Sequence, residues 1–315
     1  MSGKAIFQRD EFAHAALDFG STTLDLADYA TTGLRIVAVG PSGIGKTNAG
    51  LLIAEQLSAQ GWVSVLLDPE GEIEALYGTP VADPAAVARR IGDRKEPILV
   101  VRVRTASEFI PFAQAIMEAV DEHRKPVYLM LDETQLFSAS RRRQGDVGEA
   151  SDLVNDFVQR GRKRSLDLFL SAHRFSGTLH RAVFTNKNLC FIGRQEDPTA
   201  WSALAPQFRG SRITFTDLAA LCPGEFYAFS RRGVEKVAMP MAAALRAVAP
   251  KATVVRPVLP ATFSDWDRRL GEIPTPRLQA LTGPVVGLLA SIVGLSAEQM
   301  AAGSRALRDE LEARA

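Results

Sequence analysis

Gly40-Pro-Ser-Gly-Ile-Gly-Lys-Thr47 is the stretch that decides the fold of this chain. It matches the pattern G-x-x-x-x-G-K-[ST] at every fixed position, and it stands between an apolar run at 34–39 and a helical pattern at 46–60. Between a strand and a helix, such a loop directs backbone N–H groups and the positive end of the helix dipole at phosphate groups. The stretch therefore predicts a nucleotide-binding loop. The residues expected at the nucleotide are Gly40, Pro41, Ser42, Gly43, Ile44, Gly45, Lys46, Thr47 and Asn48.

Two acids at the end of a later apolar run supply the expected second half of the site. The run 127–131 is followed at once by Asp132 and Glu133. In this pattern Lys46 reaches the β and γ phosphates, and the Thr47 hydroxyl and Asp132 hold Mg²⁺. Glu133 would polarise the attacking water as general base. An acidic pair at a strand end can instead cap the next helix. A built-in base argues against a GTPase switch or a small-molecule kinase.

Further apolar runs alternate with helical patterns along the first two thirds of the chain. Runs that are apolar on both faces and separated by helices are typical of a parallel sheet covered on both sides. The expected strands are 34–39, 62–67, 97–103, 127–131, 166–170 and 188–192, with an amphipathic helix over 106–124. Residues 225–239 predict a hairpin closed by a turn that contains Gly233. The fold class is therefore α/β, a P-loop NTPase with a mostly parallel sheet and a C-terminal β-hairpin.

The distribution of proline and of apolar residues divides the chain into four parts. Residues 1–33 form an N-terminal arm, and 34–242 form the nucleotide-binding core. Several prolines between 240 and 260 indicate an extended linker over 243–260. Residues 261–315 are expected to be a helical C-terminal extension. This extension is either an assembly or packing element, or the first helices of a winged-helix DNA binder.

Polar residues at two other strand ends are further candidates for the site. Asp68 and Glu72 follow the run 62–67, at the edge where parallel sheets bind their ligands. They position nucleotide or water, or they form a capped turn. His173 follows the run 166–170 and is expected to lie between the two acidic strand ends, where it could sense the γ phosphate. An isolated histidine is also compatible with a structural role.

Two basic clusters have both a functional and a plain interpretation. The cluster Arg160-Gly-Arg-Lys-Arg164 ends an amphipathic helix, where the helix dipole stabilises cations in any case. The other interpretation is an arginine finger, a guanidinium that reaches the γ phosphate of a neighbouring subunit. A glycine-containing loop before that helix carries Arg141, Arg142 and Arg143. These arginines either neutralise the phosphates of DNA or are simply solvated.

Composition and charge bound the class of protein. Of the 315 residues, 46% are hydrophobic and 23% are charged, and the net charge is +1, so any attraction to DNA is local. Cys190 and Cys222 stand in apolar contexts and are expected to be buried, reduced thiols. The chain starts without a secretory signal pattern, and the apolar run 284–295 is too short for a membrane span. We expect a cytoplasmic protein without a membrane partner.

Together, these motifs resemble the HerA branch of the FtsK/HerA superfamily. The resemblance rests on the order and spacing of Gly40–Thr47, Asp68-Pro-Glu-Gly-Glu72, Leu131-Asp-Glu133, Arg160-Gly-Arg-Lys163, Ser171-Ala-His-Arg174 and Pro223-Gly-Glu-Phe226. It covers roughly residues 34–240 and implies a RecA-like core of the additional-strand, catalytic-glutamate type, with ATP and Mg²⁺ as cofactors. It also implies a homo-oligomeric ring, expected as a hexamer, with active sites between subunits and double-stranded DNA in the pore.

The resemblance also implies individual roles and a function. Arg162 matches a position from which a finger could act in trans, with Arg160 beside it, and His173 stands where the family usually has a glutamine. The N-terminal β-barrel typical of HerA has no room before the core. The expected function is ATP-driven translocation of double-stranded DNA. One alternative is an ATP-dependent scaffold or switch that gates a partner effector such as a nuclease, and another is a coupling ATPase of a conjugation or secretion system.

Overall fold

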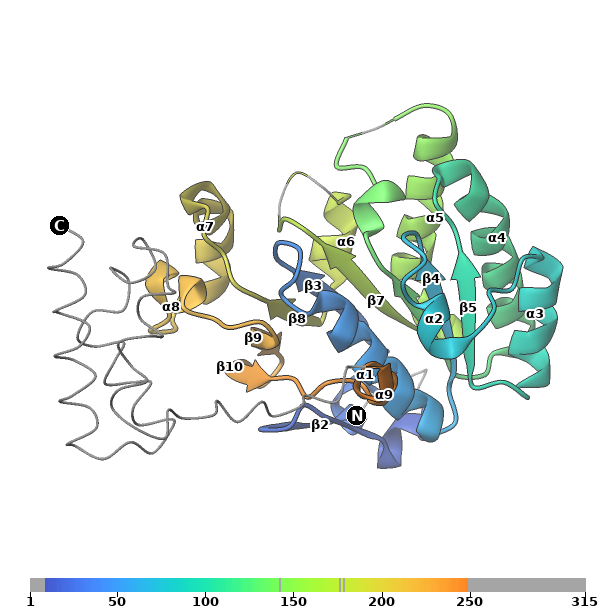
Figure 1. The fold of residues 1–315 in the computed structure, drawn as a ribbon, viewed down its shortest axis with the longest axis horizontal. Coiled ribbons are helices and arrows are strands. Elements are labelled where there is room, and N and C mark those ends of the chain that lie inside the picture. Colours follow the sequence, from blue (N-terminus) through green and yellow to red (C-terminus); the bar gives the residue numbers. More distant parts are fainter. Residues whose placement is uncertain (1–8, 142, 176, 178, 249–315) are drawn as a thin grey trace, which may run out of the picture. The chain divides into compact units, whose positions relative to one another are not determined.

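A computed structural model describes residues 9–141, 143–175, 177 and 179–248, and its centre is an eight-stranded sheet (Figure 1). The strands lie in the order β10-β9-β8-β3-β7-β6-β4-β5. Their bounds are β3 Arg35–Val39, β4 Val63–Asp68, β5 Ile98–Arg102, β6 Val127–Leu131, β7 Leu166–Ala172, β8 Leu189–Ile192, β9 Glu225–Ser230 and β10 Gly233–Ala238. Each of the six apolar runs of the sequence therefore forms a strand of this sheet.

The order of the strands defines the fold class. The strands from β3 to β8 are parallel, and β9 and β10 pair antiparallel at one edge. β7 lies between β3, which leads into the glycine-rich loop, and β6, which precedes the two acids. This inserted strand is the additional-strand arrangement, so the expected α/β P-loop NTPase fold is confirmed. In the hairpin, Gly233 pairs with Ser230 as part of β10, and the turn consists of Arg231 and Arg232 instead.

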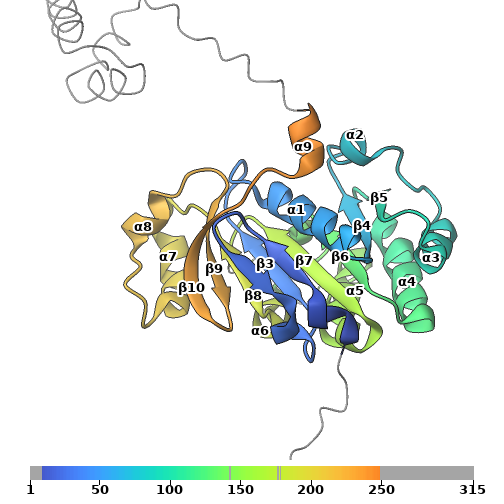
Figure 2. The same ribbon diagram turned by 90° about the horizontal axis from the view of Figure 1, so that it is seen from below.

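Helices cover both faces of the sheet because its central strands are apolar on both sides (Figure 2). On β3, Val37 belongs to the core beneath α4 and α5, whereas Ile36 belongs to the core beneath α1. The helices are α1 Lys46–Ala59, α2 Glu74–Tyr77, α3 Pro84–Asp93, α4 Ala106–His123, α5 Asp146–Arg160, α6 Arg181–Asn186, α7 Pro198–Leu204, α8 Phe215–Ala219 and α9 Ala243–Val248. The carboxyl ends of the parallel strands thus meet at one edge between two helical layers.

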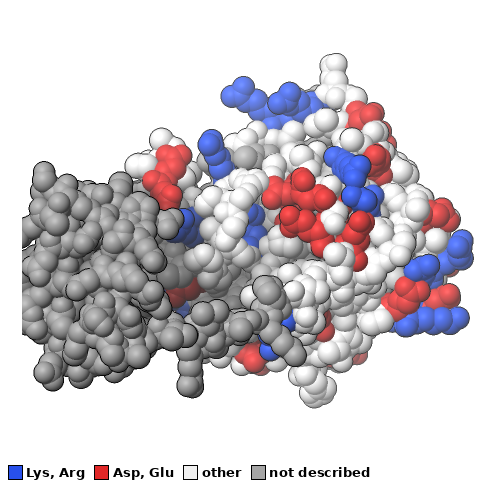
Figure 3. All heavy atoms as spheres, in the orientation of Figure 1, with Lys and Arg blue, Asp and Glu red and all other residues white. Residues whose placement is uncertain are grey.

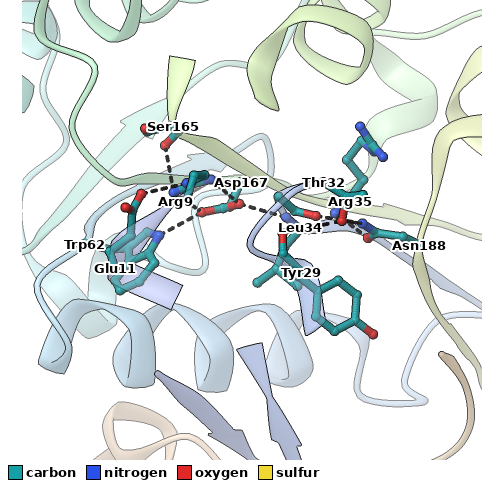
Figure 4. Close-up of polar contacts among 11 residues, drawn as sticks. Arg9, Glu11, Tyr29, Thr32, Leu34, Arg35, Trp62, Ser165, Asp167 and Asn188 are labelled. Carbon is teal, nitrogen blue, oxygen red and sulfur yellow. Dashed lines mark hydrogen bonds and ion pairs between the residues drawn. The ribbon is translucent and has the colours of Figure 1, made fainter. Parts of the chain in front are cut away.

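Residues 9–33, expected as an N-terminal arm, pack against the core. They contain the 3-10 helices η1 (Asp10–His14) and η2 (Leu26–Tyr29) and a small antiparallel sheet of β1 (Ala16–Asp18) and β2 (Thr23–Asp25). Figure 4 shows the polar anchor of this segment, in which Arg9 donates to the fully buried carboxylate of Asp167 at 2.9 and 3.0 Å. The Trp62 indole and the N–H of Leu34 also donate to Asp167, each at 2.8 Å. A partner so far away in the chain leaves no local pattern in the sequence.

The expectation of an extended linker from residue 243 is wrong for its first part. Residues 243–248 form α9, which lies beside α1 and α2 (Figures 1 and 2). The Glu55 carboxylate on α1 accepts hydrogen bonds from the N–H groups of Ala243 at 2.6 Å and Ala244 at 2.9 Å, so it caps the first turn of α9. Prolines suggested a linker, but the alanine-rich stretch between them favours a helix. The rest of the expected linker and the helical extension 261–315 lie outside the described residues.

The two cysteines differ in their surroundings. Cys190 on β8 is buried, and burial raises the pKa of its thiol to about 12. Cys222 is exposed, which corrects the expectation that both thiols are buried. The preceding Leu221 turns inward and is 2% exposed, whereas Cys222 and the following Pro223 are exposed. Among the described residues, none of the helices is both long and apolar enough to cross a membrane.

Candidate active site

Left-handed glycines shape the loop that joins β3 to α1. Gly45, directly before α1, has φ 96°, and a side chain there would meet the backbone N of Gly224 at 3.3 Å. The N–H of Gly224 donates to the carbonyl of Ile44 at 2.9 Å, so the segment before β9 holds the loop. These contacts require glycine at position 45 and fix the N-terminus of α1 at the edge of the sheet.

Lys46 lies inside this loop and is 5% exposed. Its Nζ donates to the carbonyls of Gly40 at 2.8 Å and Pro41 at 3.0 Å. Burial lowers the pKa of Lys46, and the charges of Glu133 and Asp132 act in the opposite direction. The loop therefore contains a cation whose present partners are neutral carbonyls, a suitable counter-charge for phosphate.

A cleft of about 640 Å³ opens in front of the loop, a volume within the range of roughly 300–1,000 Å³ common for small-molecule sites. It is lined by Ser42, Gly43, Gly45, Lys46, Thr47, Asp68, Pro69, Glu70, Glu72, Ile73, Asp132, Glu133 and His173. Figure 3 shows acidic side chains gathered on the surface near α2, where Glu70 and Glu72 are exposed. The cleft thus joins the loop to the acids of the β4 and β6 ends.

Asn48, which was also expected at the nucleotide, is not among the residues that line the cleft. It contacts the chain near α9, donating to Pro240 O at 3.1 Å and accepting from Ala242 N at 2.8 Å.

Thr47 and Asp132 meet in the cleft and fit a magnesium ion. The Thr47 hydroxyl donates to Asp132 Oδ2 at 2.7 Å, although the two residues come from α1 and from the end of β6. Hydroxyl and carboxylate oxygens are ligands that Mg²⁺ prefers, completed by water and phosphate oxygens. Among the described residues there is no group of three or more His, Cys, Asp or Glu that could hold a metal. The hydroxyl of Thr47 and the carboxylate of Asp132 leave further ligand positions to water and phosphate oxygens, so this pair fits an ion bound together with a nucleotide.

Glu133 has the least common backbone conformation in the site. Its φ is 47° and its ψ is 45°, in the left-handed region that residues with a side chain seldom adopt. Its Oε2 contacts His173 Nε2 at 2.5 Å, and it also accepts a hydrogen bond from the side-chain amide of Gln135. The carboxylate lines the cleft together with Lys46, so it is placed for a water molecule near a terminal phosphate. Helix capping, the plain alternative, is unsupported, because the Glu133 side chain makes no cap hydrogen bond to η3 (Thr134–Leu136).

His173 reaches the cleft from a different place than expected. We expected it between the two acidic strand ends, but β6 and β4 are direct neighbours in the sheet. β7, which leads to His173, lies instead between the loop strand β3 and β6. The histidine therefore follows the strand that separates the loop strand from the strand of the two acids, and it contacts Glu133 in the cleft.

Asp68 shows the pattern of a turn residue. It is 2% exposed, and its Oδ1 accepts from the N–H groups of Gly71 at 2.9 Å and Glu72 at 3.3 Å. Its Oδ2 accepts from Ile73 at 2.8 Å and Glu74 at 3.2 Å. Four backbone donors use both oxygens, so the capped-turn interpretation accounts for Asp68, while the exposed Glu72 remains a candidate at the cleft.

The basic candidates lie outside the cleft. Arg162 belongs to η4 (Gly161–Arg164), before β7 and thus at the opposite edge of the sheet, and it donates to Thr31 O at 3.1 Å. Arg160 is exposed and pairs with Asp156 on α5 at 3.1 Å. Neither contacts the chain's own cleft. Arg141 and Arg143 are exposed and line a second cleft of about 870 Å³ with His180, while Arg142 lies outside the described residues.

Comparison with solved structures supports the fold. The genome packaging NTPase B204 from Sulfolobus turreted icosahedral virus 2 has a TM-score of 0.53 in complex with sulfate, at 16% identity over 67% of this chain and 98% of that chain. The same protein in complex with AMPPCP gives 0.52 at 16% identity over 65% and 97%. No family model and no curated protein matches the sequence. At this identity the likeness shows a shared fold, that of a P-loop NTPase.

Two residues of the site have no assigned role in the sequence analysis. Ser171 donates to Asp132 Oδ1 and accepts from the N–H of Glu133 at 2.9 Å. Gln135 contacts the Glu133 carboxylate. For Ser171 the signal was a hydroxyl in a fully buried strand whose other residues are apolar except Asp167, because a buried hydroxyl requires a partner. For Gln135 there was no signal, because glutamine is common in surface turns.

Proposed function

We propose that this chain binds ATP with Mg²⁺ and hydrolyses it in the cleft at the carboxyl edge of the sheet. The observation that carries the proposal is the convergence of Lys46 and Thr47, from the start of α1, with Asp132 and Glu133, from the end of β6, onto one cleft. Bound Mg²⁺ would neutralise charge on the phosphates, and Thr47 and Asp132 are the residues that would hold it.

The other residues divide the chemistry between them. Lys46 exchanges the Gly40 and Pro41 carbonyls for phosphate oxygens and stabilises the charge on the group being transferred. Glu133 orients water and accepts its proton, and His173 donates to the γ phosphate. Because His173 and Glu133 contact each other, arrival of the phosphate at His173 changes the surroundings of the base at the same time.

We propose double-stranded DNA as the cargo of this ATPase. Arg141 and Arg143 lie on the loop that continues from Glu133 through η3, so a contact at this loop is connected to the base over few residues. Both arginines are exposed and border the second cleft, which suits phosphate groups. B204, which shares the fold, is by its name a genome packaging NTPase. These points favour a motor on DNA over a coupling ATPase of a secretion system.

A ring is the assembly that this site calls for, and we propose a hexamer. Within one described chain, neither Arg160 nor Arg162 reaches the cleft. An arginine that stabilises the transferred phosphoryl group would then come from a neighbouring copy. To reach a neighbouring subunit, the exposed Arg160 would lose only its ion pair with Asp156, whereas Arg162 would lose its hydrogen bond to the Thr31 carbonyl. Both arginines are therefore candidates for the finger, the expected Arg162 and Arg160 beside it.

Stimulation of ATP hydrolysis by duplex DNA tests the cargo. Reversing Arg141 and Arg143 to glutamate is expected to raise the duplex concentration for half-maximal stimulation at least ~10-fold, since two phosphate contacts become repulsive. The rate without DNA should stay at the wild-type value. The steady-state rate of phosphate release, measured against duplex concentration, gives both numbers.

A matched control has the same change of charge elsewhere. Arg89 and Lys95 are exposed near α3 and away from the second cleft, so Arg89→Glu with Lys95→Glu should leave the stimulation intact. If duplex DNA does not change the wild-type rate, the translocase proposal fails, and the alternative of a scaffold or switch for a partner effector takes its place.

A further inference from the structure

We propose that Ser171, at the carboxyl end of β7, is a positioning residue that holds Glu133 in the backbone conformation needed by the catalytic base. This inference rests on the proposed hydrolysis of ATP with Glu133 as base. Ser171 itself is fully buried and is not among the residues that line the cleft. It acts through Glu133 and Asp132 and does not contact the nucleotide.

One hydroxyl group connects both acids of the site. Ser171 Oγ accepts a hydrogen bond from the N–H of Glu133 at 2.9 Å and donates its own proton to Asp132 Oδ1. The same N–H also lies 3.1 Å from Asp132 Oδ1. The three groups thus form a closed triangle in which the hydroxyl is donor and acceptor at once.

The triangle explains why Glu133 keeps a left-handed backbone. A residue with a Cβ prefers the right-handed region, so φ of 47° persists only where the surroundings hold it. The groups that hold the Glu133 N–H are Ser171 and Asp132. Without the hydroxyl, the Glu133 N–H keeps only its longer contact to Asp132 Oδ1, and Asp132 Oδ1 itself loses a donor, so the peptide between the two acids is less restrained and the Glu133 carboxylate shifts in the cleft.

β7 is the strand from which such a group can reach the acids. Ser171 is paired with Ala38 on β3, while the preceding residue, Leu170, is paired with Leu131 at the end of β6. Two residues further on, His173 contacts the other end of Glu133, its carboxylate. The end of the inserted strand therefore holds the base at both its backbone and its side chain.

Nucleotide binding depends on other contacts. Thr47 donates to the second oxygen of Asp132, Oδ2, and Lys46 is held by carbonyls of its own loop. Neither contact involves Ser171. Loss of the hydroxyl should therefore lower kcat and leave KM and ATP affinity nearly unchanged. A residue that supported the phosphate-binding loop would instead change KM and ATP affinity.

The test compares Ser171→Ala and Ser171→Thr with the wild-type chain. Removing one charge-assisted hydrogen bond and the restraint on Glu133 is expected to reduce kcat about 10- to 100-fold in Ser171→Ala, with KM within about threefold. Ser171→Thr keeps the hydroxyl and should regain most of kcat. Ser171→Cys, which has a similar size and a weak donor, should behave like Ser171→Ala, and its melting temperature shows whether the fold is intact.

Ser64 supplies the matched control for burial of a strand hydroxyl. It is fully buried on β4, and its Oγ donates to Ala54 O at 3.2 Å, away from the two acids. Ser64→Ala should lower the melting temperature as Ser171→Ala does, with kcat unchanged. Equal kcat values for wild type and Ser171→Ala would overturn the inference, and so would an equal loss in Ser64→Ala.

The variant Glu133→Gln distinguishes a failure of the positioning role of Ser171 from a failure of the proposed ATP hydrolysis. If Glu133→Gln stops turnover and Ser171→Ala does not slow it, only the positioning role falls. If the wild-type chain hydrolyses no ATP, or Glu133→Gln hydrolyses it at the wild-type rate, the proposed function itself falls.

Discussion

Glu133→Gln is expected to lower kcat for ATP at least ~100-fold while ATP binding stays within about threefold of wild type. Glutamine keeps the size and the hydrogen-bonding reach of the side chain toward His173, but it cannot accept the proton of the attacking water. The change leaves Lys46, Thr47 and Asp132 in place, and under the proposed function these residues would still hold the phosphates and the metal. Phosphate release gives kcat, and equilibrium binding of a fluorescent ATP analogue gives the affinity.

Glu70→Gln is the control for this change because Glu70 is an exposed acid on the rim of the same cleft. It removes one negative charge from the cleft without touching the contacts of Glu133. Its turnover should remain within about threefold of wild type. Near-normal turnover in Glu133→Gln would exclude Glu133 as the base, and a parallel loss in Glu70→Gln would assign the effect to charge alone.

Arg9→Met is expected to lower the free energy of unfolding of the core by about 3–5 kcal/mol, the largest effect on stability that we expect. Arg9 and Asp167 are 2% and 0% exposed and share two hydrogen bonds. Methionine fills much of the space but leaves a buried carboxylate without its counter-charge. Urea unfolding followed by tryptophan fluorescence measures the change, since Trp62 donates to the same carboxylate.

Two further variants serve as controls for the effect of Arg9→Met on the free energy of unfolding. Arg90→Met breaks the Arg90–Glu96 pair, whose side chains are 43% and 51% exposed, and should cost less than about 1 kcal/mol. Arg9→Met combined with Asp167→Asn should recover part of the loss, since the buried charge is gone. A cost in Arg9→Met no larger than that in Arg90→Met would contradict the assignment of the pair as the anchor of residues 9–33.

The parts of the fold that could be predicted from the sequence are those with local patterns. The loop from Gly40 to Thr47 has a fixed spacing, and the runs that form β3 to β8 are apolar on both faces. Strand order is different, because pairing between distant segments leaves no local trace. The place of β7 between β3 and β6 agrees with the family resemblance and could not be derived from the runs alone.

The parts that could not be predicted depend on partners far away in the chain. The left-handed conformation of Glu133 depends on a hydroxyl 38 positions later, and the docking of residues 9–33 depends on Asp167, 158 positions after Arg9. The prolines on either side of residues 243–248 predicted a linker, whereas the helix α9 forms there with a cap from Glu55 on another helix. The sequence places Arg162 in a basic cluster at a helix end and gives no sign of its hydrogen bond to the Thr31 carbonyl in the N-terminal segment.

We propose that several copies of this chain surround duplex DNA and complete one another's active sites. The decisive measurement is the mass of the particle formed by Glu133→Gln chains with ATP and a short duplex, because this variant should bind ATP without consuming it. The expected particle is a hexamer on one duplex, with smaller species when ATP is left out. A particle of one chain under these conditions would contradict the neighbour's arginine, the central channel and translocation together.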